Sequence, residues 1–88
     1  MKNYKFIIHG KVQGVYYRVS VQKNALTAGY SGYVKNLRDG SVEAGLTCKE
    51  SQLENFINLL KKGSTCSSVI SLKYQETNER FHGNFEIL

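Results

Sequence analysis

The residues with the clearest chemical potential lie in a short segment near the N-terminus, Gly10-Lys11-Val12-Gln13-Gly14-Val15-Tyr16-Tyr17-Arg18. Its two glycines allow a sharp turn, and in such turns consecutive N–H groups can point inward together. A helix is predicted to begin at the end of the segment, and a helix N-terminus adds about half a positive charge. The segment is therefore a candidate site for an anion.

Arg18 is expected in the first turn of that helix, where a cation is unfavourable by roughly 0.3–1 kcal/mol. This placement makes sense if the guanidinium faces a bound anion, since its planar fork matches phosphate oxygens. The alternative is an ordinary strand-to-helix turn with a solvated arginine, because two glycines four residues apart are a weak motif. A Walker loop is excluded because no Gly-Lys-Ser/Thr follows.

A second candidate is Asn36, near the end of a predicted strand. Its amide both donates and accepts hydrogen bonds, so it can orient a water molecule without being ionised. A turn-forming asparagine is the commoner explanation on position alone. No Ser-His-Asp arrangement and no carboxylate cluster suited to Mg²⁺ stands out. A hydrolase built on these residues would therefore work by positioning and electrostatics.

The hydrophobic pattern predicts the elements that position these residues. Their order is β-α-β-β-α-β, followed by a short additional strand at the C-terminus. We expect strands near residues 4–8, 31–36, 41–48, 70–74 and 85–87, and helices near 16–28 and 51–62. This order is typical of the α/β (α+β) class with a ferredoxin-like split βαβ sandwich. In that fold an antiparallel sheet of four to five strands carries two helices on one face.

Periodicity within the elements predicts which residues face inward. The first helix is expected to bury Tyr17, Val21, Ala25 and Ala28. The second is expected to begin with a capping box, Ser51 to Glu54, and to bury Leu53, Phe56, Ile57 and Leu60. After the turn signal Asp39-Gly40, a half-buried strand is expected to turn Val42, Ala44, Leu46 and Cys48 inward. In the fourth strand the alternating residues are Ile70, Leu72 and Tyr74.

Length and charge narrow the possible classes of protein. The chain of 88 residues predicts one domain, residues 1–88, with a modest core. Twelve basic and seven acidic residues give a net charge of +5, which favours a negatively charged partner. Apolar runs are far too short for a membrane span or a secretory signal, so we expect a cytoplasmic protein without membrane partners.

The two cysteines, Cys48 and Cys66, are predicted to be free thiols used in packing. The second helix separates them by roughly 18 Å, whereas a disulfide needs Cα atoms within about 7 Å. Together with His9 and His82 they could supply four zinc ligands. No two of the four have zinc-finger spacing, so a metal site is not expected.

The sequence resembles the acylphosphatases in two separate places. Gly10 to Arg18 is similar to the family's first signature, a glycine, Val-Gln-Gly-Val, an aromatic residue and an arginine. Gly32-Tyr33-Val34-Lys35-Asn36, continuing through Asp39-Gly40-Ser41-Val42-Glu43, is similar to its second. The resemblance extends over nearly the whole chain and implies the same ferredoxin-like fold.

What the resemblance implies is hydrolysis of the carboxyl–phosphate bond of a small acylphosphate to a carboxylate and inorganic phosphate, which would also be a competitive inhibitor. The phosphate-binding loop would consist of Val12, Gln13, Gly14, Val15, Tyr16, Tyr17 and Arg18. Arg18 would bind phosphate and Asn36 would position the attacking water, with no metal or organic cofactor. The family also suggests a monomer.

One segment departs from the family pattern. After the second helix the family usually shows Gly-Pro and a stretch that ends in Ala-Arg-Val, whereas this chain has Gly63-Ser64-Thr65-Cys66-Ser67-Ser68-Val69. Without the proline, the loop is expected to lose about 0.4–1 kcal/mol of stability. We expect the departure to affect stability and loop geometry, not the chemistry.

Two alternatives to the enzyme remain at this point. RNA-recognition modules share the βαββαβ topology, and Gly32-Tyr33-Val34 is faintly similar to one of their strand motifs, although nucleic acid is not the expected partner. A catalytically idle phosphate-binding domain of the same fold is the other alternative. The presence of both Arg18 and Asn36 argues against an idle domain, since binding alone does not require Asn36.

Overall fold

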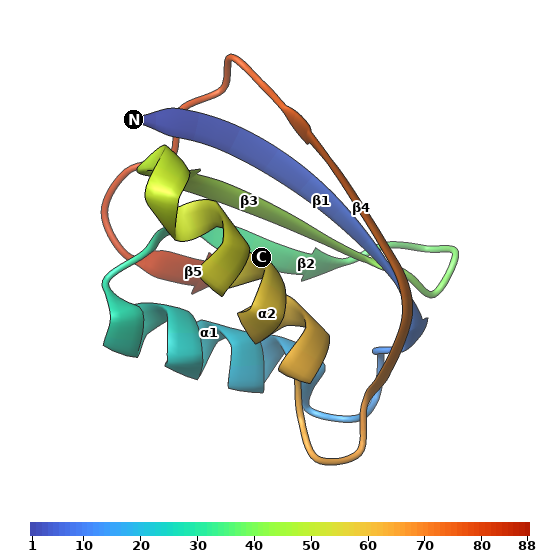
Figure 1. Cartoon of the computed structure of the whole chain (residues 1–88). Coiled ribbons are helices and arrows are strands. Elements are labelled where there is room, and N and C mark those ends of the chain that lie inside the picture. Colours follow the sequence, from blue (N-terminus) through green and yellow to red (C-terminus); the bar gives the residue numbers. More distant parts are fainter.

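The computed structural model describes residues 1–88, which form a five-stranded sheet with both helices on one face (Figure 1). The strands are β1 (Lys2–Lys11), β2 (Ser31–Asn36), β3 (Val42–Cys48), β4 (Ser68–Glu76) and β5 (Phe85–Ile87). The helices are α1 (Tyr17–Ala28) and α2 (Leu53–Lys62). The strand order is β4-β1-β3-β2-β5, which confirms the predicted ferredoxin-like fold.

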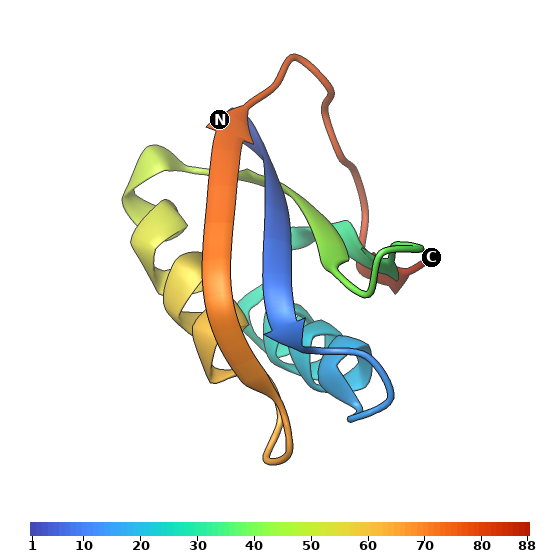
Figure 2. The same cartoon turned by 90° about the vertical axis from the view of Figure 1, so that its right-hand side faces the viewer.

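The sheet is mixed, so the prediction of a wholly antiparallel sheet is wrong at one pair. β5 runs parallel to β2, with Gly32 opposite Phe85, whereas the other three pairs are antiparallel. The C-terminal residues of β4 and the N-terminal residues of β2 lie at the same end of the sheet. The connection from β4, residues 77–84, therefore enters β5 from that end, as the arching segment in Figure 2 shows.

A hydrophobic core of 17 buried residues fills the space between the sheet and the helices. α1 contributes Tyr17, Val21 and Ala25, as predicted, but Ala28 is exposed. The helix ends at Gly29 in a left-handed conformation, and the chain then turns inward at the next residue. Tyr30 is buried there instead of Ala28, and its ring packs edge-on against another core aromatic.

The centre of the sheet is more buried than its sequence predicts. Six of the seven residues of β3 are buried, so the expectation of a half-buried strand is wrong. Residues 77–84 cover the second face: the Phe81 N–H donates to the Thr47 hydroxyl at 2.8 Å, and the Phe81 ring packs edge-on against Tyr33. A Cβ at Gly45 would lie only 2.8 Å from the Phe81 ring, so glycine is needed there.

Strand β4 changes its inward face because the β1–β4 pairing contains a bulge. His9 pairs with Ser71 but Gly10 pairs with Val69, which leaves Ile70 without a partner. An extra residue in one strand reverses the side-chain alternation there. The predicted inward position of Ile70 is therefore wrong: its side chain is 82% exposed, and Val69 packs against the core.

Helix α2 begins differently from the prediction. A 3₁₀ turn, Glu50–Gln52, leads into the helix, and the Gln52 side chain accepts the Lys49 N–H at 3.0 Å. The predicted capping box at Ser51 is therefore wrong, because the box begins two residues earlier, at Lys49. The inward face is confirmed, with Phe56 and Leu60 fully buried. Neither α1 nor α2 has the length and apolar character of a membrane-spanning helix.

Both cysteines are free, as predicted. Cys48 is buried on β3, and burial raises the pKa of its thiol. Cys66 is exposed in the α2–β4 loop, so the expectation that it packs in the interior is wrong.

Because of the bulge, the same substitution should lower the free energy of unfolding by different amounts on the two paired strands β1 and β4. Ile8 on β1 is fully buried, whereas Ile70 on β4 faces solvent. Ile8→Val should lower the free energy of unfolding by about 0.5–1.5 kcal/mol, because it leaves a cavity in the core. Ile70→Val should change it by less than about 0.5 kcal/mol. Urea denaturation of the two variants measures this, and equal losses would show that Ile70 is packed.

Candidate functional site

The turn between β1 and α1, residues 12–16 and named here the β1–α1 loop, has an unusual backbone. Gly14 has φ +73°, and Tyr16 has φ +60°, the only positive φ of a non-glycine residue in the chain. A left-handed conformation costs a residue with a Cβ roughly 1–2 kcal/mol. Such strain persists only where the surrounding structure holds it, and it gathers at functional sites.

The backbone N–H groups from Gln13 to Val19 have no acceptor within the chain. None of the backbone or side-chain hydrogen bonds uses them as donors, and the first intrachain donor after them is the Ser20 N–H, which bonds to the Tyr16 carbonyl. The first-turn N–H groups of any helix are unpaired in this way. Here the preceding loop extends the run, so the segment can bind an anion through several backbone donors.

One side chain ties this loop to the β2–β3 hairpin. The Gln13 Nε2 amide donates to the carbonyls of Leu37 at 2.7 Å and Ser41 at 2.9 Å. The hairpin turn is itself closed by Asp39, whose carboxylate accepts the Ser41 N–H and hydroxyl. These bonds hold the pKa of Asp39 below its usual value. The loop and the hairpin are therefore positioned as one unit.

The other side of the loop is tied to the C-terminal end of α2. The Tyr17 hydroxyl donates to the Leu60 carbonyl at 2.7 Å, and burial raises the pKa of Tyr17. The Ser64 hydroxyl donates to the Val15 carbonyl at 2.6 Å. Both bonds join residues more than forty positions apart, so only the tertiary fold brings them together.

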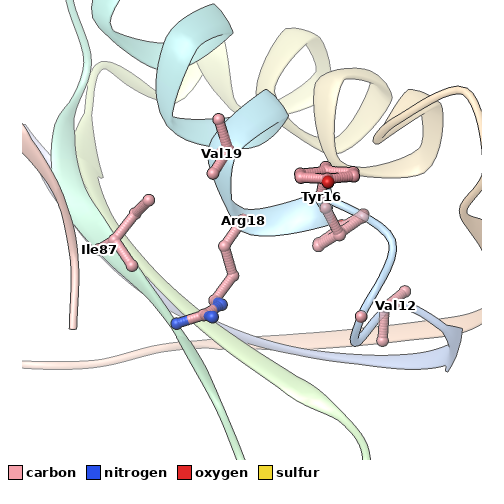
Figure 3. A pocket seen from close by; sticks show the side chains of 7 residues that line it. Val12, Tyr16, Arg18, Val19 and Ile87 are labelled. Atoms are coloured by element: carbon pink, nitrogen blue, oxygen red, sulfur yellow. The ribbon is translucent and has the colours of Figure 1, made fainter.

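A cavity of about 360 Å³ opens beside the loop. Figure 3 shows the Arg18 side chain extending from the start of α1 between Val12 and Ile87. None of the chain's ion pairs includes Arg18, so no carboxylate oxygen lies within 4.0 Å of its guanidinium nitrogens. Its charge is therefore free to bind an anion. The lining residues are Val12, Gly14, Tyr16, Tyr17, Arg18, Val19 and Ile87.

The predicted site residues are only partly brought together in this cavity. Gln13 and Val15 do not line it: the Gln13 side chain turns to the hairpin, and Val15 is buried. Asn36, at the end of β2, is exposed, and its side chain makes no hydrogen bond in the chain. It does not line the cavity either. Its side chain shares the helix-covered face of the sheet with Val34, two residues earlier.

Sequence reasoning missed three residues that border the loop or its cavity. Val19 follows Arg18 on α1 and is 55% exposed. An apolar residue beside a candidate cation and off the predicted buried face of the helix was an available signal. Ile87 and Ser64 gave no such signal, because each comes from a distant part of the chain.

No group of three or more His, Cys, Asp or Glu side chains in residues 1–88 is arranged to hold a metal ion. The four residue positions that could have supplied zinc ligands, His9, Cys48, Cys66 and His82, therefore form no such cluster.

Comparison with known proteins gives a consistent result. The family model described as Acylphosphatase matches residues 4–87. An acylphosphatase of Methanocella arvoryzae is 39% identical over 87 residues, which cover 99% of both chains. One of Bacillus licheniformis is 39% identical over 79 residues, which cover 90% of this chain and 88% of that protein. The crystal structure of acylphosphatase from Bacillus subtilis superposes with a TM-score of 0.92 at 36% identity, covering 100% of this chain and 99% of the other.

Two glycines provide a matched test of the loop. Gly14 in the loop and Gly29 at the end of α1 both have positive φ, and a Cβ would meet nothing within 4 Å at either. Each change to alanine should therefore cost roughly 1–2 kcal/mol of stability through backbone strain alone. Only Gly14→Ala should also weaken the binding of inorganic phosphate, measured by isothermal titration calorimetry. Equal phosphate affinity in the two variants would place the anion elsewhere.

Proposed function

Since the chain belongs to the acylphosphatase family, we propose that its β1–α1 loop and Arg18 bind the phosphoryl group of the substrate, and that Asn36 positions the attacking water. The enzyme is an acylphosphatase: it hydrolyses the carboxyl–phosphate bond of an acylphosphate and releases a carboxylate and inorganic phosphate.

The observation that carries the proposal is the run of unpaired N–H groups, Gln13 to Val19, next to an arginine without a carboxylate partner. A run of consecutive backbone donors in a turn suits a tetrahedral anion with several acceptor oxygens. The Arg18 fork adds two parallel donors and a full positive charge. Such preorganised donors stabilise the charge that spreads over the non-bridging oxygens in the transition state.

The water molecule needs orientation more than activation. The exposed Asn36 amide oxygen can accept a hydrogen bond from the water and hold the water oxygen in line with the phosphorus. The water oxygen then bonds to phosphorus, the bond from phosphorus to the acyl oxygen breaks, and a phosphoryl oxygen takes the proton. The neighbouring Asp39 is a poor base, because its bonds to Ser41 lower its pKa. The departing carboxylate is a weak base and needs no acid catalyst.

The acyl part of the substrate has an apolar wall to lie against. Val19 and Ile87 line the cavity beside Arg18, and Tyr16 is 80% exposed at its edge. Burying a hydrocarbon or aromatic acyl group there is favourable at about 25 cal/mol per Å² of apolar surface. This arrangement supports an acylphosphate whose acyl group is uncharged.

The proposal includes no metal or cofactor, and it places a monomeric enzyme in the cytoplasm, where thiols such as Cys48 and Cys66 stay reduced. The RNA-binding alternative has lost its main support. Its motif residue Tyr33 is buried, and the hydroxyl donates to Glu43 at 2.7 Å instead of leaving the ring open for stacking on a base.

Replacement of Arg18 tests the phosphate contact. Arg18→Lys keeps the charge but loses the bidentate fork, so kcat/KM for acetyl phosphate should fall by roughly 10²–10³. Arg80→Lys makes the same change in residues 77–84, away from the cavity, and should leave the rate unchanged. Steady-state release of phosphate measures both. A full rate in Arg18→Lys would contradict the proposed fork.

Replacement of Asn36 separates catalysis from binding. Asn36→Ala should lower kcat for benzoyl phosphate by roughly 10²–10³, because the water loses its orienting group. The inhibition constant of inorganic phosphate should stay unchanged, since the loop and Arg18 are intact. Asn58→Ala on the exposed face of α2 is the matched control. Wild-type turnover in Asn36→Ala would remove Asn36 from the mechanism.

A further inference from the structure

We propose that Ser64, in the loop between α2 and β4, is a positioning residue for phosphate binding. Its hydroxyl holds the Val15 carbonyl and thereby directs the Tyr16 N–H toward the phosphoryl group. The inference rests on the proposed function of the β1–α1 loop. It assigns a part in phosphate binding to a segment that the sequence connects only with stability and loop geometry.

The geometry of a trans peptide makes this link direct. The Ser64 hydroxyl donates to the Val15 carbonyl at 2.6 Å, and the chain contains no cis peptide. Within one planar trans peptide the C=O and the following N–H point in opposite directions. A bond that holds the Val15 carbonyl toward Ser64 therefore holds the Tyr16 N–H away from Ser64. That N–H belongs to the run of donors without an acceptor in the chain.

The orientation of Ser64 is itself determined by its own turn. The Ser67 hydroxyl accepts the Ser64 N–H at 2.8 Å and donates to the Ser64 carbonyl at 2.9 Å, and the Ser67 N–H reaches the same carbonyl at 3.2 Å. Three hydrogen bonds thus close a tight turn around Ser64. Its hydroxyl is presented to the β1–α1 loop from a backbone that has little freedom to move.

This turn is also packed directly on the first residue of α1. A Cβ at Gly63 would lie 2.6 Å from the Tyr17 ring, so only glycine allows the approach. The Tyr17 hydroxyl donates to Leu60, in the last turn of α2. The start of α1 and the turn around Ser64 are therefore joined by close packing and by the Tyr17 bond, in addition to the bond to Val15.

The strained conformation of Tyr16 explains why such a support is needed. Its left-handed φ of +60° is unfavourable for a residue with a side chain, and its ring is 80% exposed and gains little from packing. The unfavourable conformation must therefore be held through the backbone on either side. The Ser64–Val15 bond acts on the peptide that immediately precedes Tyr16.

The test compares Ser64→Ala with the wild-type chain. The inhibition constant of inorganic phosphate and the KM for acetyl phosphate should each rise roughly 3–10-fold, the effect of losing one orienting hydrogen bond. In ¹H–¹⁵N spectra the Tyr16 amide should shift strongly when phosphate is added to the wild type, and much less in Ser64→Ala. Ser64→Thr restores the hydroxyl and should return the inhibition constant to within about twofold of wild type.

Thr27→Ala is the matched control, because it removes a hydroxyl that donates to a carbonyl, that of Lys23, at 3.0 Å elsewhere on α1. It should change neither phosphate binding nor the Tyr16 amide shift. If Ser64→Ala does not fold, Ser64→Cys keeps a weaker donor of similar shape and should show an intermediate inhibition constant.

A folded Ser64 variant without the hydroxyl that binds phosphate as wild type does, with an unchanged Tyr16 shift, would overturn the inference alone. A wild-type chain that neither hydrolyses acetyl phosphate nor is inhibited by phosphate would overturn the proposed function instead.

Discussion

The feature on which this site depends is a run of backbone N–H groups, Gln13 to Val19, that no acceptor in the chain satisfies. An unpaired backbone donor is unfavourable unless water or a ligand bonds to it, and a flexible loop would turn such groups in different directions. Here the loop is held by side chains that act on its flanks. Gln13 reaches the β2–β3 hairpin and Tyr17 reaches the end of α2, while Ser64, just after α2, holds the Val15 carbonyl.

The positive charge of Arg18 favours an anion at the same place as the unpaired backbone N–H groups do. Arg18 stands at the helix end where the dipole is already positive, and no carboxylate neutralises it. Both features are unfavourable without an anion, and under the proposed function a bound, doubly charged phosphoryl group would offset them. The net charge of +5 adds long-range attraction for such a substrate. The unliganded site is therefore already organised for binding, at some cost in stability.

The sheet supplies the rigid frame for these contacts. The last residues of β1 pair with β4 after the bulge at Gly10, so the β1–α1 loop leaves the sheet at a defined place. β2 and β3 are joined by the hairpin that Gln13 holds, and β3 is buried on both faces. Asn36 ends the strand next to that hairpin. Its position relative to the loop thus follows from the packing of the sheet and not from the adjoining sequence.

Much of this protein could be predicted from its sequence, because helix and strand periodicity and glycine-rich turns depend on residues a few positions apart. The element order, the faces of the two helices, the loop at Gly14 and the candidacy of Arg18 and Asn36 all came from such local patterns.

Only the tertiary structure decided the parallel pairing of β5, the outward turn of Ile70 and the contacts that Ile87 and Ser64 make around the site. These features join segments distant in the chain or depend on the register between strands. Local propensity carries no information on either, because the energy that selects them comes from packing the whole core at once.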